Sequence, residues 1–424
     1  MRKAILSLPP QFLLLGAVIS ISVWLAAIAS NFLLLAIPLL LITGYLAVVD
    51  VKTLFFLLLS CIPLSTEVVF SNGFGTDIPT EPIMVGLMGI YLLQTLKYPS
   101  TLGNSFLRHP ITLLLLLHLG WIAITTITSD QLIVSIKYLL AKTWYVVVFY
   151  FMASYFIQTD KDIRRFFWWI LIPLLSTMIV VNLRHAAYGF SFEDIYRVLS
   201  PFYRNHVAYA CIMAVFFPFI AASVYWFWER SRLRNLLLII SIFFLIAIYF
   251  SYTRAAYVAL LLAGLSYWMV YWRLTKWVIL FAVGSLFIGI SYLASENRYL
   301  EYAPDFERTI THTEFDDLIS ATYKLEDIST MERVYRWVGG VFMVQEKPWM
   351  GFGPGNFYDF YKSYTVNRFR TYVSNNPEQS GIHNYYLMVA VEQGIIGLIW
   401  FILLCAAVLW IGEKRLPPYK IGKR

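Results

Sequence analysis

The sequence predicts an all-α protein that crosses a membrane about twelve times and carries one large loop domain between the eleventh and twelfth helices. Two observations predict this class. Of the 424 residues, 59% are hydrophobic and only 14% are charged, whereas soluble domains hold about 45–50% apolar and about 25% charged residues. Long apolar runs also recur along most of the chain, and about 20 such residues span a bilayer. This composition excludes a soluble enzyme and a disordered chain.

The apolar runs define the expected helices. The first run follows Met1-Arg2-Lys3 and has no small-residue cleavage site, so it is expected to be a retained helix rather than a signal peptide. The last run is followed only by a short basic tail. The twelve runs lie near 11–30, 32–49, 53–70, 80–96, 110–128, 132–156, 163–183, 205–228, 236–250, 255–272, 277–294 and 384–411.

One hydrophilic segment, 295–382, interrupts this series. Pro, Gly, Tyr and Trp are scattered through it and it shows no low complexity, so it is expected to fold as a domain with a helix near 329–346. The chain therefore divides into a membrane bundle at 1–294, a loop domain at 295–382, and a last helix with its tail at 383–424.

The net charge of +8 follows the alternation of the loops. If the N-terminus is cytoplasmic, the inner segments hold 18 of the 33 Lys and Arg residues, while the short outer segments hold only four. Short cytoplasmic loops carry such an excess, whereas a long loop is translocated whatever its charge. Both termini are therefore expected in the cytoplasm and segment 295–382 outside. The positive charge reports topology, and no nucleic-acid partner is expected.

Polar groups gather at the expected outer ends of three helices. Arg204-Asn205-His206 precedes one helix, Arg254 lies in a very short turn between two others, and His383-Asn384 opens the last one. A guanidinium offers phosphate a planar fork of donors, and a neutral imidazole accepts a proton from a hydroxyl. The set suits transfer from a lipid-linked phosphate donor. The alternative for each arginine is snorkelling to headgroups, and for His383 a capping or packing role.

Three ionisable residues are expected inside spanning helices. Lys142 lies about ten residues into its helix, Glu392 falls roughly opposite His383 on the last helix, and His118 lies in mid-helix. Structural pairing or contact with water is the favoured role for Lys142 and Glu392, and a satisfied bundle histidine for His118. Lys142 stays a supporting candidate for the site, together with Asn384 and His206.

Several chemistries lack their motifs. The sequence contains no Gly-x-x-x-x-Gly-Lys-Ser/Thr loop and no His-Glu-x-x-His motif, so neither an ATP-driven pump nor an intramembrane metalloprotease is indicated. The acidic run Glu314–Asp317 is better read as a solvated face than as a metal site. No metal and no cofactor are expected. The alternative of a different class is a small-anion transporter. A transporter places its binding site near the midplane of the membrane, where the sequence offers only Lys142, Glu392 and His118.

Three segments resemble the O-antigen ligase and polymerase superfamily. His383-Asn384 followed by nine residues and Gly394-Ile395-Ile396-Gly397 is similar to its histidine and glycine signature. Glu332-Arg333, Trp337 and the run Pro348–Phe357 resemble its outer-loop pattern. The stretch Ser251–Val258 resembles its Arg-x-x-x-Leu segment, with valine in place of leucine.

The resemblance implies a metal-independent, inverting glycosyltransferase of the O-antigen ligase type in the bacterial inner membrane, working at the periplasmic face. The donor would be a glycan linked to undecaprenyl diphosphate, and the acceptor a sugar hydroxyl of lipid A-core. His383 would be the general base, while Arg254, Arg333 and Arg204 would bind the diphosphate. Gly394 and Gly397 would permit close helix packing. An O-antigen or capsule polymerase and a protein O-oligosaccharyltransferase are the alternatives within the superfamily.

Overall fold

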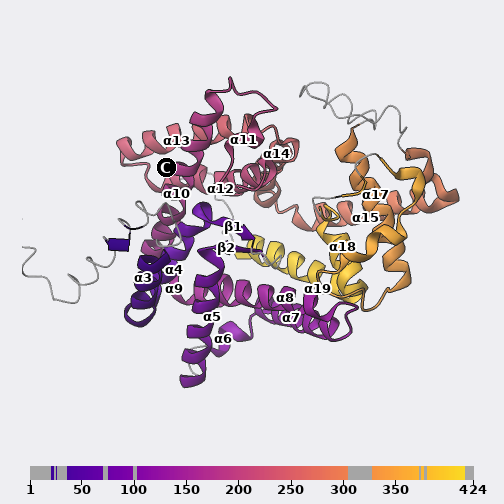
Figure 1. Ribbon diagram of the computed structural model, residues 1–424, viewed down its shortest axis with the longest axis horizontal. Helices are drawn as coiled ribbons and strands as arrows, with labels where there is room; N and C mark the ends of the chain where they lie inside the picture. Colours follow the sequence, from indigo (N-terminus) through magenta and orange to yellow (C-terminus); the bar gives the residue numbers. More distant parts are fainter. Residues whose placement is uncertain are drawn as a thin grey trace, which may run out of the picture. The chain divides into compact units, whose positions relative to one another are not determined.

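The computed structural model describes residues 21–22, 25, 36–69, 75–98, 103–303, 327–371, 374–376 and 380–415. Helices make up most of these residues, as the sequence predicts (Figure 1). The helices are α3 (Ala36–Val49), α4 (Val51–Cys61), α5 (Thr80–Lys97), α6 (Asn104–Leu107), α7 (Pro110–Ile127), α8 (Leu132–Val146), α9 (Ala153–Phe156), α10 (Asp160–Ala186), α11 (Ile195–Val198), α12 (His206–Trp226), α13 (Ser231–Tyr249), α14 (Arg254–Tyr271), α15 (Thr275–Ala294), α17 (Ile328–Glu346), α18 (Phe357–Phe360) and α19 (Tyr385–Arg415).

Eight helices of the described part are long and apolar enough to cross a membrane. They are α7, α8 with its extension to Phe156, α10, α12, α13, α14, α15 with its extension to Tyr302, and α19. α14 and α15 leave nearly all their apolar side chains exposed, which suits contact with lipid. The chain is thus an all-α, multi-pass membrane protein.

The remaining predicted spans either coincide with helices outside this set of eight or lie outside the described residues. Runs 32–49, 53–70 and 80–96 coincide with α3, α4 and α5. The expected helix at 53–70 is too long, because α4 and a 3₁₀ turn end at Leu64 and a strand follows. Most of run 11–30 and the tail 416–424 lie outside the described residues, as does the acidic run Glu314–Asp317. The count of twelve helices stays a prediction.

The chain forms two compact units. The expected division into bundle, loop and last helix stays a prediction. The first unit contains residues 1–99 and 144–180. Its core joins apolar side chains of α4, α5 and the π-helical turn Val147–Met152. It also holds a two-stranded antiparallel sheet that the sequence pattern did not predict, β1 (Thr66–Val69) and β2 (Gly75–Ile78), with Thr66 opposite Ile78.

The second unit contains residues 100–143 and 181–424. Within it α12 packs against α13 and α14, α7 against α19, and α17 against α19. The predicted loop helix near 329–346 is present as α17. Tyr335 and Met343 of α17 meet Phe357, Tyr361 and Phe369 in a core that also contains Val391 of α19. Segment 295–382 is therefore folded in its described parts.

The last helix is not the single rod that the sequence predicts. Gly394 has φ 70° and ψ −179°, and it divides α19 into two arms. The ring centroids of Tyr385 and Phe401 lie 5.1 Å apart, although 16 residues of straight helix would separate them by about 24 Å. The arms therefore fold back on each other, so the straight run after Gly394 is the part long enough to span.

Gly394 and Gly397 each allow a close approach of a different kind. A Cβ on Gly394 would lie 2.0 Å from the Trp349 carbonyl oxygen, so the loop after α17 presses directly on the reversal. The backbone groups freed at the reversal find partners in the same loop, since Ile395 N–H donates to the Pro348 carbonyl at 2.7 Å. Gly397 faces Trp121 of α7 and serves helix packing, as expected.

Candidate functional site

Arg254 is the first residue of α14 and is held by a carboxylate. The preceding turn is tight, with Ser251 fully buried and its hydroxyl donating to the Ile248 carbonyl at 2.6 Å. The Arg254 guanidinium donates to Asp327 Oδ2 at 3.0 Å. Asp327 is almost completely buried. Arg254 thus connects the start of α14 to the start of α17, and it does not extend away as a snorkelling side chain would.

Asp327 also caps α17. Its carboxylate accepts the Thr330 backbone N–H at 3.1 Å, which satisfies one of the free donors at a helix start. This cap places Arg333 in the second turn of α17. The Arg333 Nε is buried and makes no hydrogen bond within the described part of the chain. Burial, and next the positive charge of Arg254, lower the pKa of Arg333.

The carbonyls before His383 are anchored to α17. Trp337 Nε1 donates to the Ile382 carbonyl at 2.8 Å, and Arg336 donates to the Gly381 carbonyl at 3.2 Å. His383 itself adopts φ 54°, a left-handed conformation that few non-glycine residues take. The ring is exposed. Partial desolvation, and then the charges of Arg333 and Arg336, lower the pKa of His383, so the imidazole is neutral near pH 7.

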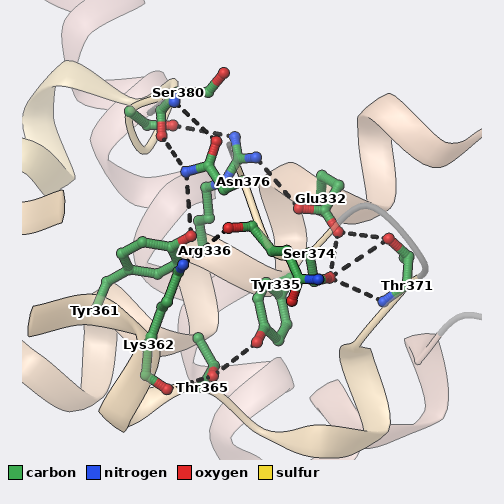
Figure 2. Close-up of polar contacts among 12 residues, drawn as sticks. Glu332, Tyr335, Arg336, Tyr361, Lys362, Thr365, Thr371, Ser374, Asn376 and Ser380 are labelled. Carbon is green, nitrogen blue, oxygen red and sulfur yellow. Dashed lines mark hydrogen bonds and ion pairs between the residues drawn. The ribbon is translucent and has the colours of Figure 1, made fainter. Parts of the chain in front are cut away.

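A buried polar network supports this anchor (Figure 2). Glu332 accepts hydrogen bonds from Thr371 Oγ1 at 2.6 Å and Ser374 Oγ at 2.5 Å. Its other oxygen accepts from Arg336 at 3.2 Å, and both members of this ion pair are more than nine-tenths buried. Asn376 in turn donates to Tyr361 Oη and to the Ser380 carbonyl. The network attaches the described parts of segment 371–382 to α17.

Arg204 and His206 lie at the start of the neighbouring helix α12. Asn205 caps this helix by accepting the Ala208 N–H at 2.8 Å. The backbone carbonyl of His206 accepts from the Thr253 hydroxyl at 3.4 Å, so this start adjoins the turn that presents Arg254. The His206 ring packs edge-on against Tyr196. Arg204 is exposed.

The other sequence candidates have defined places. Asn384 caps the first arm of α19 by accepting the Leu387 N–H at 3.2 Å. Lys142 donates to the Tyr385 hydroxyl at 2.9 Å, which places it beside the residue two positions after His383. His118 is buried and bonded to Gln393, as expected of a satisfied bundle histidine.

Glu392 has a structural partner that the sequence did not reveal. It is buried, and one carboxylate oxygen faces the Phe357 backbone N–H at 3.4 Å. The backbone carbonyls of Val391 and Glu392 accept the N–H groups of Phe352 and Gly353. The glycine-containing loop 351–357 therefore docks on the first arm of α19, and its backbone donors are used within the protein rather than presented to a phosphate.

The structure brings Arg333 within electrostatic range of both Arg254 and His383, which lie far apart in the sequence. It adds Asp327 and Arg336, which the sequence did not indicate, and it gives Glu332, known until then only from the motif, a structural partner. Two signals could have found these contacts: Asp is a preferred residue at the start of a helix, and Glu332 precedes Arg336 by four residues, as in a helical ion pair. Three guanidiniums against two carboxylates leave this cluster with a net charge of +1.

No group of three or more His, Cys, Asp or Glu side chains that could hold a metal ion occurs in the described ranges. A reaction without metal stays an expectation from the sequence.

The helices, the core around α17 and this cluster define a membrane protein with an arginine cluster near a histidine. Comparison with known proteins adds a family likeness for part of the chain. Residues 236–402 match the family model described as O-Antigen ligase, and the resemblance seen in the sequence motifs is confirmed for this part, which begins within α13 and ends within α19. No curated protein and no solved structure gives a significant match.

Proposed function

We propose that this protein is an O-antigen ligase-type glycosyltransferase, which moves a glycan from undecaprenyl diphosphate to a sugar hydroxyl of lipid A-core at the periplasmic face of the inner membrane. The observation that carries the proposal is that Arg333 lies within electrostatic range of both Arg254 and His383. The family match supports a membrane glycosyltransferase in general terms. The particular donor and acceptor come from the resemblance of the motifs.

The proposed reaction is a single displacement. The acceptor hydroxyl oxygen bonds to the anomeric carbon of the donor sugar while the bond from that carbon to the diphosphate oxygen breaks, so the configuration inverts. The hydroxyl proton passes to His383, and the electron pair of the broken bond leaves with the lipid diphosphate. A general base of this kind typically contributes about 10²–10⁴ in rate.

The electrostatics around His383 suit both parts of this step. The neutral imidazole has a nitrogen free to accept a proton near pH 7. Arg333 keeps a buried donor without a partner in the described structure, and the diphosphate would supply the missing acceptor. Fixed guanidiniums stabilise the negative charge as it develops on the leaving group, because they need no reorganisation at the moment of reaction.

The test is the substitution His383→Ala in a strain that depends on this protein for surface polysaccharide. The expected result is loss of attached O-antigen, with the variant still inserted at the wild-type level. Normal attached O-antigen in that strain would contradict the role of His383. Deletion of the gene separates the two closest alternatives: a ligase leaves long lipid-linked polymer unattached, whereas a polymerase leaves single lipid-linked repeats.

A further inference from the structure

The fold-back of α19 places one lysine of a spanning helix against Tyr385, two residues after the proposed base. Lys142 lies in α8, and its Nζ donates to the Tyr385 hydroxyl at 2.9 Å. The same ammonium lies 5.3 Å from the ring centroids of Tyr138 and Tyr385. Tyr385 follows His383 by two residues. A straight α19 would not create this arrangement, because Tyr385 packs against Phe401 only through the reversal at Gly394.

The partners of Lys142 leave its charge without a counter-ion. A lysine offers three donors, and the hydrogen bond to Tyr385 uses one of them. Two other lysines of the described part form ion pairs between separate elements, Lys52 with Asp162 and Lys347 with Asp130, both at 2.6 Å. No such ion pair forms at Lys142 among the described residues, where a phenol and two ring faces surround the ammonium.

Glu392 does not neutralise this cation. Its carboxylate lies close enough to interact with Lys142 through space, but it is directed at the backbone N–H of Phe357 in the docked loop. A cation kept within a spanning helix is unfavourable unless it has a partner or a function. The two unused donors of Lys142 are therefore suited to an anion that arrives with a substrate.

We propose that Lys142 and Tyr385 form a second anion subsite, which binds a phosphate group of the acceptor glycolipid while Arg254 and Arg333 bind the donor diphosphate. The proposal rests on the proposed function. The two subsites come from different elements, α8 on one hand and α14 with α17 on the other, and both adjoin His383. A lysine is a compact point charge that suits a single phosphate, whereas the arginine fork suits the bidentate grip of a diphosphate.

The test measures transfer by the purified full-length protein in nanodiscs. The donor is held at saturation, and the acceptor is titrated either with its phosphates intact or after their removal by a phosphatase. Lys142→Met should raise the acceptor KM about tenfold on the intact acceptor, the effect of losing one charge-assisted hydrogen bond. The donor KM and kcat should stay unchanged. On the dephosphorylated acceptor, wild type and Lys142→Met should have the same KM.

Two matched variants accompany this one. Lys137→Met removes the same charge five residues earlier on α8 and should leave both KM values unchanged. Lys142→Arg keeps the charge and should stay within about threefold of the wild-type acceptor KM. If Lys142→Met does not fold, as judged by thermal unfolding, the wild type still tests the proposal: removal of the acceptor phosphates should raise its KM about tenfold, and an unchanged KM would overturn the subsite.

The results that would overturn the proposed subsite differ from the result that would contradict the proposed function. An unchanged acceptor KM for Lys142→Met would overturn it, as would an equal increase on both acceptors, which indicates a headgroup phosphate or a packing role. A raised donor KM would assign Lys142 to the donor instead. A wild-type protein that transfers glycan to neither acceptor would contradict the proposed function itself.

Discussion

Two neighbouring faces of α17 use the same residue types in opposite ways. On one face Arg336 and Glu332 form a buried ion pair, and every carboxylate oxygen of Glu332 has a donor from Thr371, Ser374 or Arg336. The Nε atoms of both arginines are buried without a partner among the described residues, but the other nitrogens of Arg336 donate to Glu332 and to the Gly381 carbonyl. On the other face no ion pair of Arg333 forms among the described residues, and the nearby Asp327 is engaged by Arg254 and the helix start.

This difference assigns a structural role to Arg336 and a ligand-binding role to Arg333. A buried polar network fixes one conformation of the chain, here the described parts of segment 371–382 that lead to His383. Arg333 pairs with no carboxylate among the described residues, and its buried donor is unfavourable by about 1–3 kcal/mol without an acceptor, which an anionic ligand would supply. The Arg333 face is therefore the one that we expect to bind the lipid diphosphate.

The largest effect is expected from Arg333→Gln. Loss of one electrostatic partner of the leaving group should lower the transfer rate about 10²–10³-fold. Thermal unfolding of the variant should match that of the wild type, because Arg333 makes no ion pair among the described residues. A glycan-transfer assay on the purified protein measures the rate. A rate within twofold of the wild-type rate would place Arg333 outside the site.

A smaller loss is expected from Arg254→Lys. The ammonium keeps the charge and can still contact Asp327, but it cannot form a planar fork with phosphate, so the transfer rate should fall about tenfold. Measurement of the donor KM and kcat in the same assay checks this. Wild-type kinetics would show that Arg254 only holds α14 to α17.

Glu332→Gln should lower stability more than transfer, which is the opposite of the effect expected for Arg333→Gln. The substitution leaves Arg336 buried without a counter-ion, which should destabilise the fold by about 3 kcal/mol. We expect a lower thermal unfolding temperature, with a smaller loss of transfer by the folded protein than Arg333→Gln produces. A variant as stable as the wild type would contradict the structural role of this network.

The smallest effect is a change in pH dependence. The charge of Arg333 lowers the pKa of His383, and the base must be neutral to accept a proton. In Arg333→Gln the pKa of His383 should rise, so the acidic limb of the residual rate should move to higher pH. The pH profile of kcat/KM in the free enzyme measures this limb. If the acidic limb does not move, the charge of Arg333 has no effect on the pKa of the catalytic base.

The sequence predicted most of the described helices and the loop helix α17, because hydropathy reports those features directly. The roles of Arg254, Arg333 and His383 stay predictions. The sequence did not predict the reversal at Gly394 or the strand pair, since a glycine in an apolar run is compatible with both a straight and a folded helix. It also missed the contact of Lys142 with Tyr385, which exists only because of that reversal.

The central claim is tested most directly by the affinity of the purified protein for undecaprenyl diphosphate without a glycan. Wild type, Arg333→Gln and the control Arg197→Gln would be compared in one titration; Arg197 is an exposed arginine already paired with Asp194 at 2.8 Å. The account predicts that the wild type and Arg197→Gln bind equally, and that Arg333→Gln binds at least about tenfold more weakly. Equal binding by all three proteins would contradict it.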